Sequence, residues 1–254
     1  MKTKILLNIL THGDELVGLK VAEIIKQRNP TIIGNGLDVQ IANEEAYRRG
    51  KRCIDKDLNR VFPGDPNGSV EEKRAHELTP VVSSYDMVVD VHSTESGSGD
   101  MVIVTKLDDE TKKTVKALSP KYVLYMNMPP DRSLISCARI GIAFEMGSDK
   151  DEATCEKTVE GVECLLSYRG FTTSGRSFGF ASECFEVFDQ VLKPANAILE
   201  PYVENFTKVY AGEVFAKKAN GDPLIAEYDF YPVIFGNTNY ETIFGFAARP
   251  LTLD

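Results

Sequence analysis

The chain carries little positive charge for its length. Its 254 residues include 29 Lys and Arg against 38 Asp and Glu, which gives a formal net charge of −9. Surfaces that bind nucleic acid or anionic membranes need an excess of basic residues. We therefore expect neither nucleic acid nor a membrane as a partner.

Long hydrophobic runs and paired cysteine motifs are also missing. The apolar run at residues 5–10 is interrupted by Asn8 and is far shorter than the ~20 residues of a membrane span. The five cysteines are odd in number and show no CxxC spacing, as is typical of reduced thiols in a cytosolic protein. These absences predict a cytoplasmic protein without a transmembrane segment or a signal peptide.

The composition favours a folded globular protein. Hydrophobic residues make up 43% of the chain and charged residues 26%, which is enough apolar surface to bury a sizeable core. A length of 254 residues allows one large domain or a large domain with a small one. We find no internal repeat and no low-complexity tract.

The first two thirds of the chain alternate between strand and helix patterns. Ser69 and Glu72 form a capping box at the start of one expected helix. The expected strands cover residues 3–10, 37–42, 87–92, 101–105, 122–125 and 140–145, and the expected helices cover residues 15–29, 69–84, 109–118 and 151–168. This alternation predicts an α/β fold, with a parallel or mixed sheet that carries helices on both faces.

The helical period disappears after about residue 177. Short strand patterns at residues 185–188, 212–216, 224–228 and 242–247 are separated by turns. We therefore expect two domains, a large α/β domain at residues 1–175 and a small, mostly β domain at residues 176–254.

The sequence contains only three histidines. His12 and Glu15 lie three positions apart at a strand-to-helix turn, and His92 ends a later strand. Since the carboxyl ends of strands line the ligand crevice of an open α/β sheet, these side chains can converge there. Two histidines and one glutamate form the three-ligand set of a catalytic zinc, although either histidine alone would more simply be a hydrogen-bonded polar residue. His76, in the middle of an expected helix, has no such partner.

Glu145 ends an expected strand in which two small residues, Gly141 and Ala143, share its face. A carboxylate at the carboxyl end of a strand, bordered by small residues, is suited to act as a general base on water. An ion pair at the end of the strand would explain Glu145 equally well.

The loop at residues 48–60 reverses the charge of the chain. It carries six Lys or Arg and only two acidic residues, Asp55 and Asp57. Arginine side chains bind carboxylates through two parallel hydrogen bonds, so this loop favours an anionic small substrate. A solvated surface loop is the simpler alternative for a run of charge.

Four segments together, at residues 11–15, 52–60, 90–93 and 144–147, resemble the succinylglutamate desuccinylase/aspartoacylase family. Their order and approximate spacing match over about two thirds of the chain. The resemblance implies a zinc-dependent amidohydrolase with a carboxypeptidase-like α/β catalytic domain and helices on both faces of a mixed sheet. It also implies a small β domain at the C-terminal end.

The resemblance implies a role for each residue of the catalytic centre. His12, Glu15 and His92 would hold one zinc ion per chain. Glu145 would be the general base, and Arg52 would polarise the scissile carbonyl group.

The resemblance also implies residues that bind the substrate. Asn59 and Arg60 would hold a substrate carboxylate, and Arg132 would be a second carboxylate-binding arginine. The C-terminal domain would contribute Tyr240 to the active site and would cover the site.

The resulting hypothesis is hydrolysis of the amide bond of an N-acyl amino acid to a carboxylate and a free amino acid. The substrate would be small and anionic, such as N-acetylaspartate or N-succinylglutamate. A metallocarboxypeptidase acting on peptides is an alternative, and a zinc-binding module without catalysis is another. Glu145 and Arg52 argue against the last, because such a module needs neither a base nor an oxyanion donor. A homo-oligomer is compatible with the sequence.

Overall fold

The computed structural model describes residues 4–94 and 99–253. The strands are β1 (Ile5–Ile9), β2 (Leu37–Ile41), β3 (Met87–His92), β4 (Met101–Val104), β5 (Tyr122–Tyr125), β6 (Gly141–Glu145), β7 (Glu183–Leu192), β8 (Ile198–Leu199), β9 (Val214–Lys217), β10 (Pro223–Ile225), β11 (Tyr231–Val233) and β12 (Ile243–Pro250). The α-helices are α1 (Val17–Arg28), α2 (Glu44–Arg48), α3 (Val70–Ser83), α4 (Asp109–Leu118) and α5 (Glu152–Tyr168), and the short 3₁₀ helices are η1 (Leu58–Arg60) and η2 (Leu134–Cys137).

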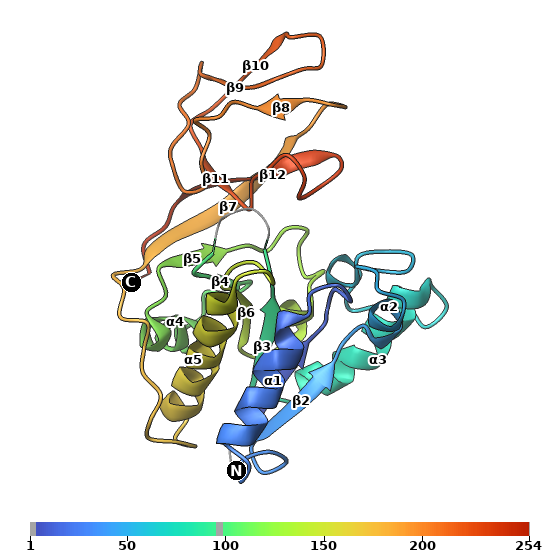
Figure 1. Cartoon of the computed structure of the whole chain (residues 1–254), viewed down its shortest axis with the longest axis vertical. Helices are drawn as coiled ribbons and strands as arrows, with labels where there is room; N and C mark the ends of the chain where they lie inside the picture. The colour runs from blue at the N-terminus through green and yellow to red at the C-terminus, as the bar shows by residue number, and fades with distance from the viewer. Residues whose placement is uncertain (1–3, 95–98, 254) are drawn as a thin grey trace.

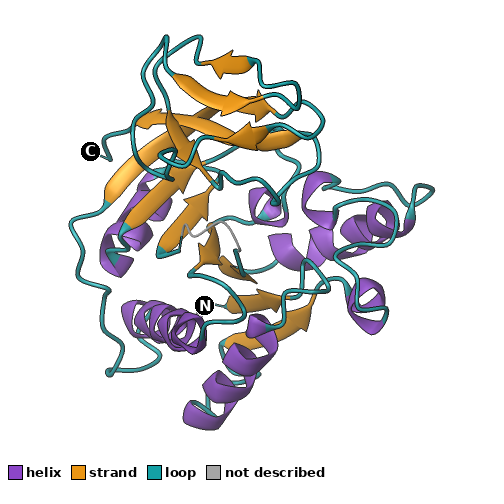
Figure 2. Ribbon diagram, turned by 45° about the horizontal axis from the view of Figure 1, so that its top comes forward, coloured by secondary structure: helices purple, strands orange, loops and turns teal. Residues whose placement is uncertain are grey.

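Most of these strands belong to one mixed sheet. Among the described residues, nine strands form a sheet in the order β11-β12-β7-β5-β4-β6-β3-β1-β2, and β10-β9-β8 form a small antiparallel sheet. Figure 2 shows the helices gathered around the large sheet and the small sheet set apart from them. The predicted α/β class, with a mixed sheet and a C-terminal β region, is confirmed.

Two hydrophobic layers enclose the large sheet. On one face, buried side chains of α1, α4 and α5 join those of β1, β3 and β6. On the other face, α3 and η2 supply the cover. Every residue of β1 and β3 is buried, as expected for central parallel strands that are covered on both sides.

Three parallel strands in the middle of the sheet set the position of the site. β6, β3 and β1 are direct neighbours, and His92 on β3 lies opposite Glu145 on β6. Because these strands run in the same direction, the segments that follow them meet at one edge of the sheet. This edge collects the turn after β1 and the ends of β3 and β6.

Three C-terminal strands, β7, β12 and β11, continue the large sheet beyond β5. β7 pairs in parallel with β5 and then, further along, in antiparallel fashion with β12. Figure 1 shows β7 leading from the α/β layers to the strands at the top of the molecule. Strands from both sides of residue 175 therefore share one sheet. Beyond it, Phe215, Phe230, Phe235 and Phe244 form a core of their own with edge-to-face and stacked ring contacts.

One short helix lies where the sequence indicates a polar loop. α2 occupies residues 44–48, and the Asn43 side chain accepts a hydrogen bond from the Ala46 N–H at 3.3 Å, which caps the helix. A helix of five residues is too short to show a hydrophobic period. Sequence patterns therefore miss it.

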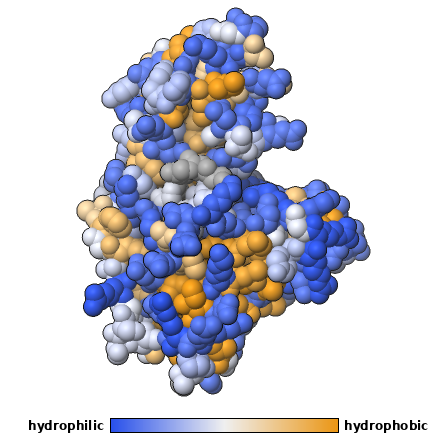
Figure 3. All heavy atoms as spheres, viewed as in Figure 1, coloured by the Kyte–Doolittle hydropathy of each residue, from blue (hydrophilic) through white to orange (hydrophobic). Residues whose placement is uncertain are grey.

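The surface is largely polar on the face shown in Figure 3, where blue hydrophilic residues surround smaller orange apolar patches. In the part of the chain that the structure describes, none of the helices combines the length and apolar character needed to cross a bilayer.

Gly141, at the start of β6, allows close packing of the sheet on η2. A Cβ atom at this position would collide with the backbone carbonyl oxygen of Ile135. Since a backbone atom cannot move aside as a side chain can, we expect Gly141→Ala to lower the free energy of unfolding by about 1–3 kcal/mol. Urea unfolding of both proteins measures this difference. An unchanged midpoint would show that η2 is free to shift.

Candidate active site

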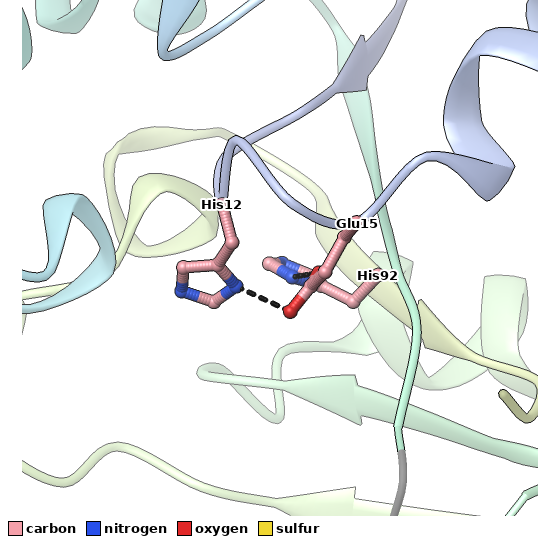
Figure 4. A group of neighbouring side chains, drawn as sticks. All are labelled: His12, Glu15 and His92. Atoms are coloured by element: carbon pink, nitrogen blue, oxygen red, sulfur yellow. Dashed lines mark hydrogen bonds and ion pairs between the residues drawn. The ribbon is translucent and has the colours of Figure 1, made fainter. Parts of the chain in front are cut away.

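Three side chains converge at the carboxyl ends of β1 and β3. Glu15 lies between the two histidines: its Oε1 atom is 2.7 Å from His12 Nδ1, and its Oε2 atom is 2.9 Å from His92 Nδ1. Figure 4 shows His12 and Glu15 approaching from the turn after β1, with His92 on the neighbouring strand. One donor atom from each residue lies within 4.8 Å of the others, and all three residues are buried. Two imidazole nitrogens and a carboxylate oxygen could therefore hold a metal ion.

Each histidine has a second carboxylate behind it. Asp90 Oδ2 lies 2.9 Å from His92 Nε2, and Asp57 Oδ1 lies 3.1 Å from His12 Nε2. A carboxylate on the far nitrogen orients the ring and directs the other nitrogen to a metal. The two Nδ1 atoms, which face Glu15, would therefore be the nitrogens that bind the metal.

Asp90 is itself part of a buried polar group inside the sheet. Its Oδ1 atom accepts hydrogen bonds from Asn8 Nδ2 at 2.6 Å and from the Thr11 hydroxyl at 2.7 Å. All three residues are inaccessible to solvent. Sequence reasoning did not assign Asn8, Thr11 or Asp90 to the site. The available signal was a polar residue that interrupts each of two otherwise apolar strands.

Glu145 presents an unpartnered oxygen to the same place. Its Oε2 atom is buried and, among the described residues, makes no hydrogen bond. Burial raises the pKa of Glu145 to about 7, with the neighbouring Glu15 charge adding to the effect. A carboxyl group that exchanges a proton near neutral pH and has a free acceptor atom fits a general base.

Arg52 places its guanidinium beside the metal-ligand candidates. Nη1 donates to Glu15 Oε1 at 3.1 Å, and Nη2 donates to Asp57 Oδ2 at 3.3 Å. Nη2 also lies 2.9 Å from His12 Nε2. The Arg52 side chain is 44% exposed. It therefore keeps a polar face that could reach an oxygen atom of a bound ligand.

A cavity of about 630 Å³ opens over these groups. Of the predicted site residues, the structure brings the following to its wall: His12, Glu15, Arg52, Asn59, Arg60, His92, Glu145 and Tyr240. The Asn59 side-chain oxygen accepts the Leu134 N–H at 2.9 Å, which leaves its amide nitrogen as the donor end. The Tyr240 ring packs edge-to-face on Phe246. Its pKa is raised by burial to about 12, so the phenol keeps its proton at neutral pH.

Arg132 is not brought to this cavity. The chain turns at residues 130–131 and then enters η2, and this turn places Ser133 and Ile135 on the cavity wall. The Arg132 carbonyl accepts the Phe62 N–H, while the residue as a whole is exposed. The structure therefore gives no support to the predicted second carboxylate-binding arginine.

The segment after Glu145 is tied to both metal-ligand segments. Asp149 accepts the backbone N–H groups of Leu16 at 2.6 Å and Val17 at 3.0 Å, and so caps the helix that follows Glu15. The Gly147 carbonyl accepts the Thr94 N–H at 2.8 Å, two residues after His92. These bonds fix the candidate base relative to the candidate metal ligands.

Comparisons with known proteins agree on one family. Residues 2–169 match the model of the succinylglutamate desuccinylase/aspartoacylase catalytic domain. An N-acyl-aromatic-L-amino acid amidohydrolase (carboxylate-forming) of Xenopus tropicalis is 25% identical over 91% of this chain and 86% of its own. An aspartoacylase of the same species is 27% identical over 74% of this chain and 69% of its own. The crystal structure of murine aminoacylase 3 superposes with a TM-score of 0.79 at 19% identity, covering 98% of this chain and 95% of the other.

The contribution of Asp90 to stability can be tested by substitution. The change Asp90→Ala removes the carboxylate that accepts from Asn8 and Thr11 and that pairs with His92 Nε2. Because an unsatisfied buried donor costs about 1–3 kcal/mol, we expect unfolding free energy to fall by roughly 3 kcal/mol, measured in urea with a chelator present. Asp86→Ala, just before the same strand, is the control: it removes only partly exposed contacts, to the Lys4 N–H and to Arg139, and should change stability by less than about 1 kcal/mol. Equal losses in the two variants would mean that the buried group adds no stability.

Proposed function

The chain belongs to the succinylglutamate desuccinylase/aspartoacylase family, and from this membership we propose that it hydrolyses the amide bond of N-acyl amino acids with the help of one zinc ion. The observation that carries the proposal is the position of Glu145. Its unpartnered buried oxygen belongs to a strand end that lies opposite His92. A base beside a set of metal ligands, in a cavity lined by arginines, supports a hydrolase rather than a zinc-binding module without catalysis.

His12, Glu15 and His92 would hold the zinc ion, because their donor atoms form the two-nitrogen, one-oxygen set of hydrolytic zinc sites. When bound, zinc in such a site keeps one position open, lowers the pKa of water and polarises a carbonyl group. Side chains of the protein would transfer the proton and bind the substrate.

Glu145 moves the proton. Its carboxylate takes a proton from the attacking water at Oε2, and the water oxygen adds to the acyl carbon. Glu145 then delivers the same proton to the amine as the carbon–nitrogen bond breaks. A pKa raised by burial to about 7 suits both directions of transfer at neutral pH.

Arg52 and Arg60 would bind two different oxygen groups of the substrate. The Arg52 guanidinium, whose Nη1 atom lies 3.1 Å from Glu15 Oε1, would donate to the acyl oxygen as negative charge develops on it. Arg60 and the amide nitrogen of Asn59 line the same cavity and would hold the carboxylate of the amino acid. Tyr240 lines the same cavity and would add a neutral hydroxyl donor to it.

The substrate class follows from the same cavity. Arg52, Arg60 and Lys150 line it together with apolar side chains. Two of these come from strands, Ile103 and Ala143, and two from the segments outside them, Met126 and Ile135. We propose a small anionic N-acyl amino acid, with acidic ones such as N-acetylaspartate and N-succinylglutamate as the leading candidates. A panel that adds N-acetylphenylalanine and short peptides to these two tests the choice. Turnover of peptides alone would favour a carboxypeptidase.

The role of Glu145 is tested by Glu145→Gln. The amide keeps the shape of the side chain but cannot accept a proton, so we expect kcat to fall at least about a hundredfold while KM changes little. Zinc content, measured by elemental analysis, should stay near one per chain. Glu183→Gln, on the exposed start of β7, is the control. Near-parental turnover by Glu145→Gln would refute the base.

The two arginines should respond differently to truncation. Arg60→Ala removes a contact that is present in both the ground state and the transition state, so KM for an anionic substrate should rise about tenfold or more with kcat nearly kept. Arg52→Ala removes an oxyanion donor, so kcat should fall by roughly 10²–10³. Steady-state kinetics on one substrate separates the two effects. The reverse pattern would show that the assigned roles are exchanged.

A further inference from the structure

The loop that carries Arg52 and leads to Asn59 and Arg60 in η1 has little regular structure of its own. Between the end of α2 and the start of η1, residues 49–57 form neither a helix nor a strand. Backbone N–H groups in such a loop need acceptors from elsewhere in the protein. The substrate-binding side chains can be placed accurately only if something fixes this backbone.

Glu71, in the first turn of α3, holds the backbone of this loop and is called its anchor below. Its Oε1 atom accepts the Ile54 N–H at 2.6 Å, and its Oε2 atom accepts the N–H groups of Asp55 at 3.0 Å and Lys56 at 3.1 Å. Asn43 Nδ2 lies 3.4 Å from Oε1. One carboxylate therefore receives three consecutive backbone donors of the loop and one side-chain donor.

The anchor is buried and charged. Glu71 has 0% of its surface exposed, and a buried carboxylate is retained only where hydrogen bonds replace its water. Burial favours the neutral form, but the three backbone donors outweigh it and lower the pKa of Glu71. The neighbouring Glu72 differs, since it accepts the Ser69 N–H and the Lys56 ammonium at a partly exposed position.

We propose that Glu71 is a positioning residue for substrate recognition, which holds residues 54–56 so that Arg52 on one side and Asn59 and Arg60 on the other face the cavity. The inference rests on the proposed function, in which those three side chains contact the substrate. Glu71 itself does not line the cavity. Its effect passes through the backbone of the loop.

Glu71→Gln is the informative change. The amide keeps the size of the side chain, but one of its two ends becomes a donor, which would face a backbone donor of the loop. Glu72→Gln is the matched control, because it removes a neighbouring charge from the same helical turn and leaves the anchor intact. Glu71→Asp, which keeps the charge but shortens the reach, serves if Glu71→Gln does not fold.

Two measurements separate positioning from a general loss of stability. The first is the ratio of kcat/KM for an N-acyl amino acid to that for its carboxamide, which does not depend on the fraction of folded enzyme. We expect Glu71→Gln to lower this preference for the acid about tenfold or more, and Glu72→Gln to leave it within about twofold. An unchanged ratio in folded Glu71→Gln or Glu71→Asp would overturn the proposal.

The second measurement is amide hydrogen exchange at residues 54–56 in the zinc-free protein. Exchange should accelerate about tenfold or more in Glu71→Gln and not in Glu72→Gln, because only the first change replaces one of the two oxygens that accept these N–H groups with a donor. Unaltered exchange would overturn the anchor whatever the kinetics show. A parent protein that turns over no N-acyl amino acid would instead overturn the proposed function, and with it the recognition role of Glu71.

Discussion

The site depends on a negative charge buried between two imidazole rings. Glu15 would not stay ionised at a buried position without compensation, since burial disfavours its charge, but His12 and His92 outweigh that effect and lower its pKa. The two rings reach Glu15 because β1 and β3 are adjacent and parallel, and end at the same edge. The sheet order thus determines which side chains share this charge.

Other carboxylates around the site also accept hydrogen bonds, from the histidine rings and from backbone N–H groups. Asp90 and Asp57 hold the far nitrogens of the two rings, and Asp149 holds the backbone of the helix after Glu15. Glu71 does the same for the loop at residues 54–56. Acceptor-only groups suit this work, because a carboxylate takes several donors at once without presenting a donor of its own. Glu145 stands apart from them with its unpartnered oxygen, which is free to take up a proton.

The sequence predicts the α/β fold and the three candidate metal ligands, because both follow from local patterns of strands, turns and helices. The strand-to-helix turn placed His12 beside Glu15, and the strand ending at residue 92 brought His92 to the same edge. Asn8 and Asp90 were visible only as polar interruptions, because nothing local says that adjacent strands pair them. Nothing in the local sequence distinguishes Glu71 from other acidic residues of a first helical turn, since its three backbone donors come from a loop fifteen or more positions earlier. Arg132 stays a prediction: its neighbour Ser133 lines the cavity and Arg132 is not among the lining residues, since a motif fixes the residue type but not the turn that decides which neighbour faces the cavity.

The C-terminal strands explain how an open sheet edge becomes a cavity. The carboxyl ends of β1, β3 and β6 alone would leave the candidate catalytic groups open to bulk water, where interactions between charges are weakened by the high dielectric constant. Continuation of the sheet through β7 and β12 carries β11 and the segment that follows it back over this edge, so Ile234, Asn239 and Tyr240 join the cavity wall. The ring contact of Tyr240 with Phe246 on β12 ties this wall to the sheet itself. This part of the cavity wall is therefore a consequence of sheet extension, because the segment that joins β11 to β12 supplies it.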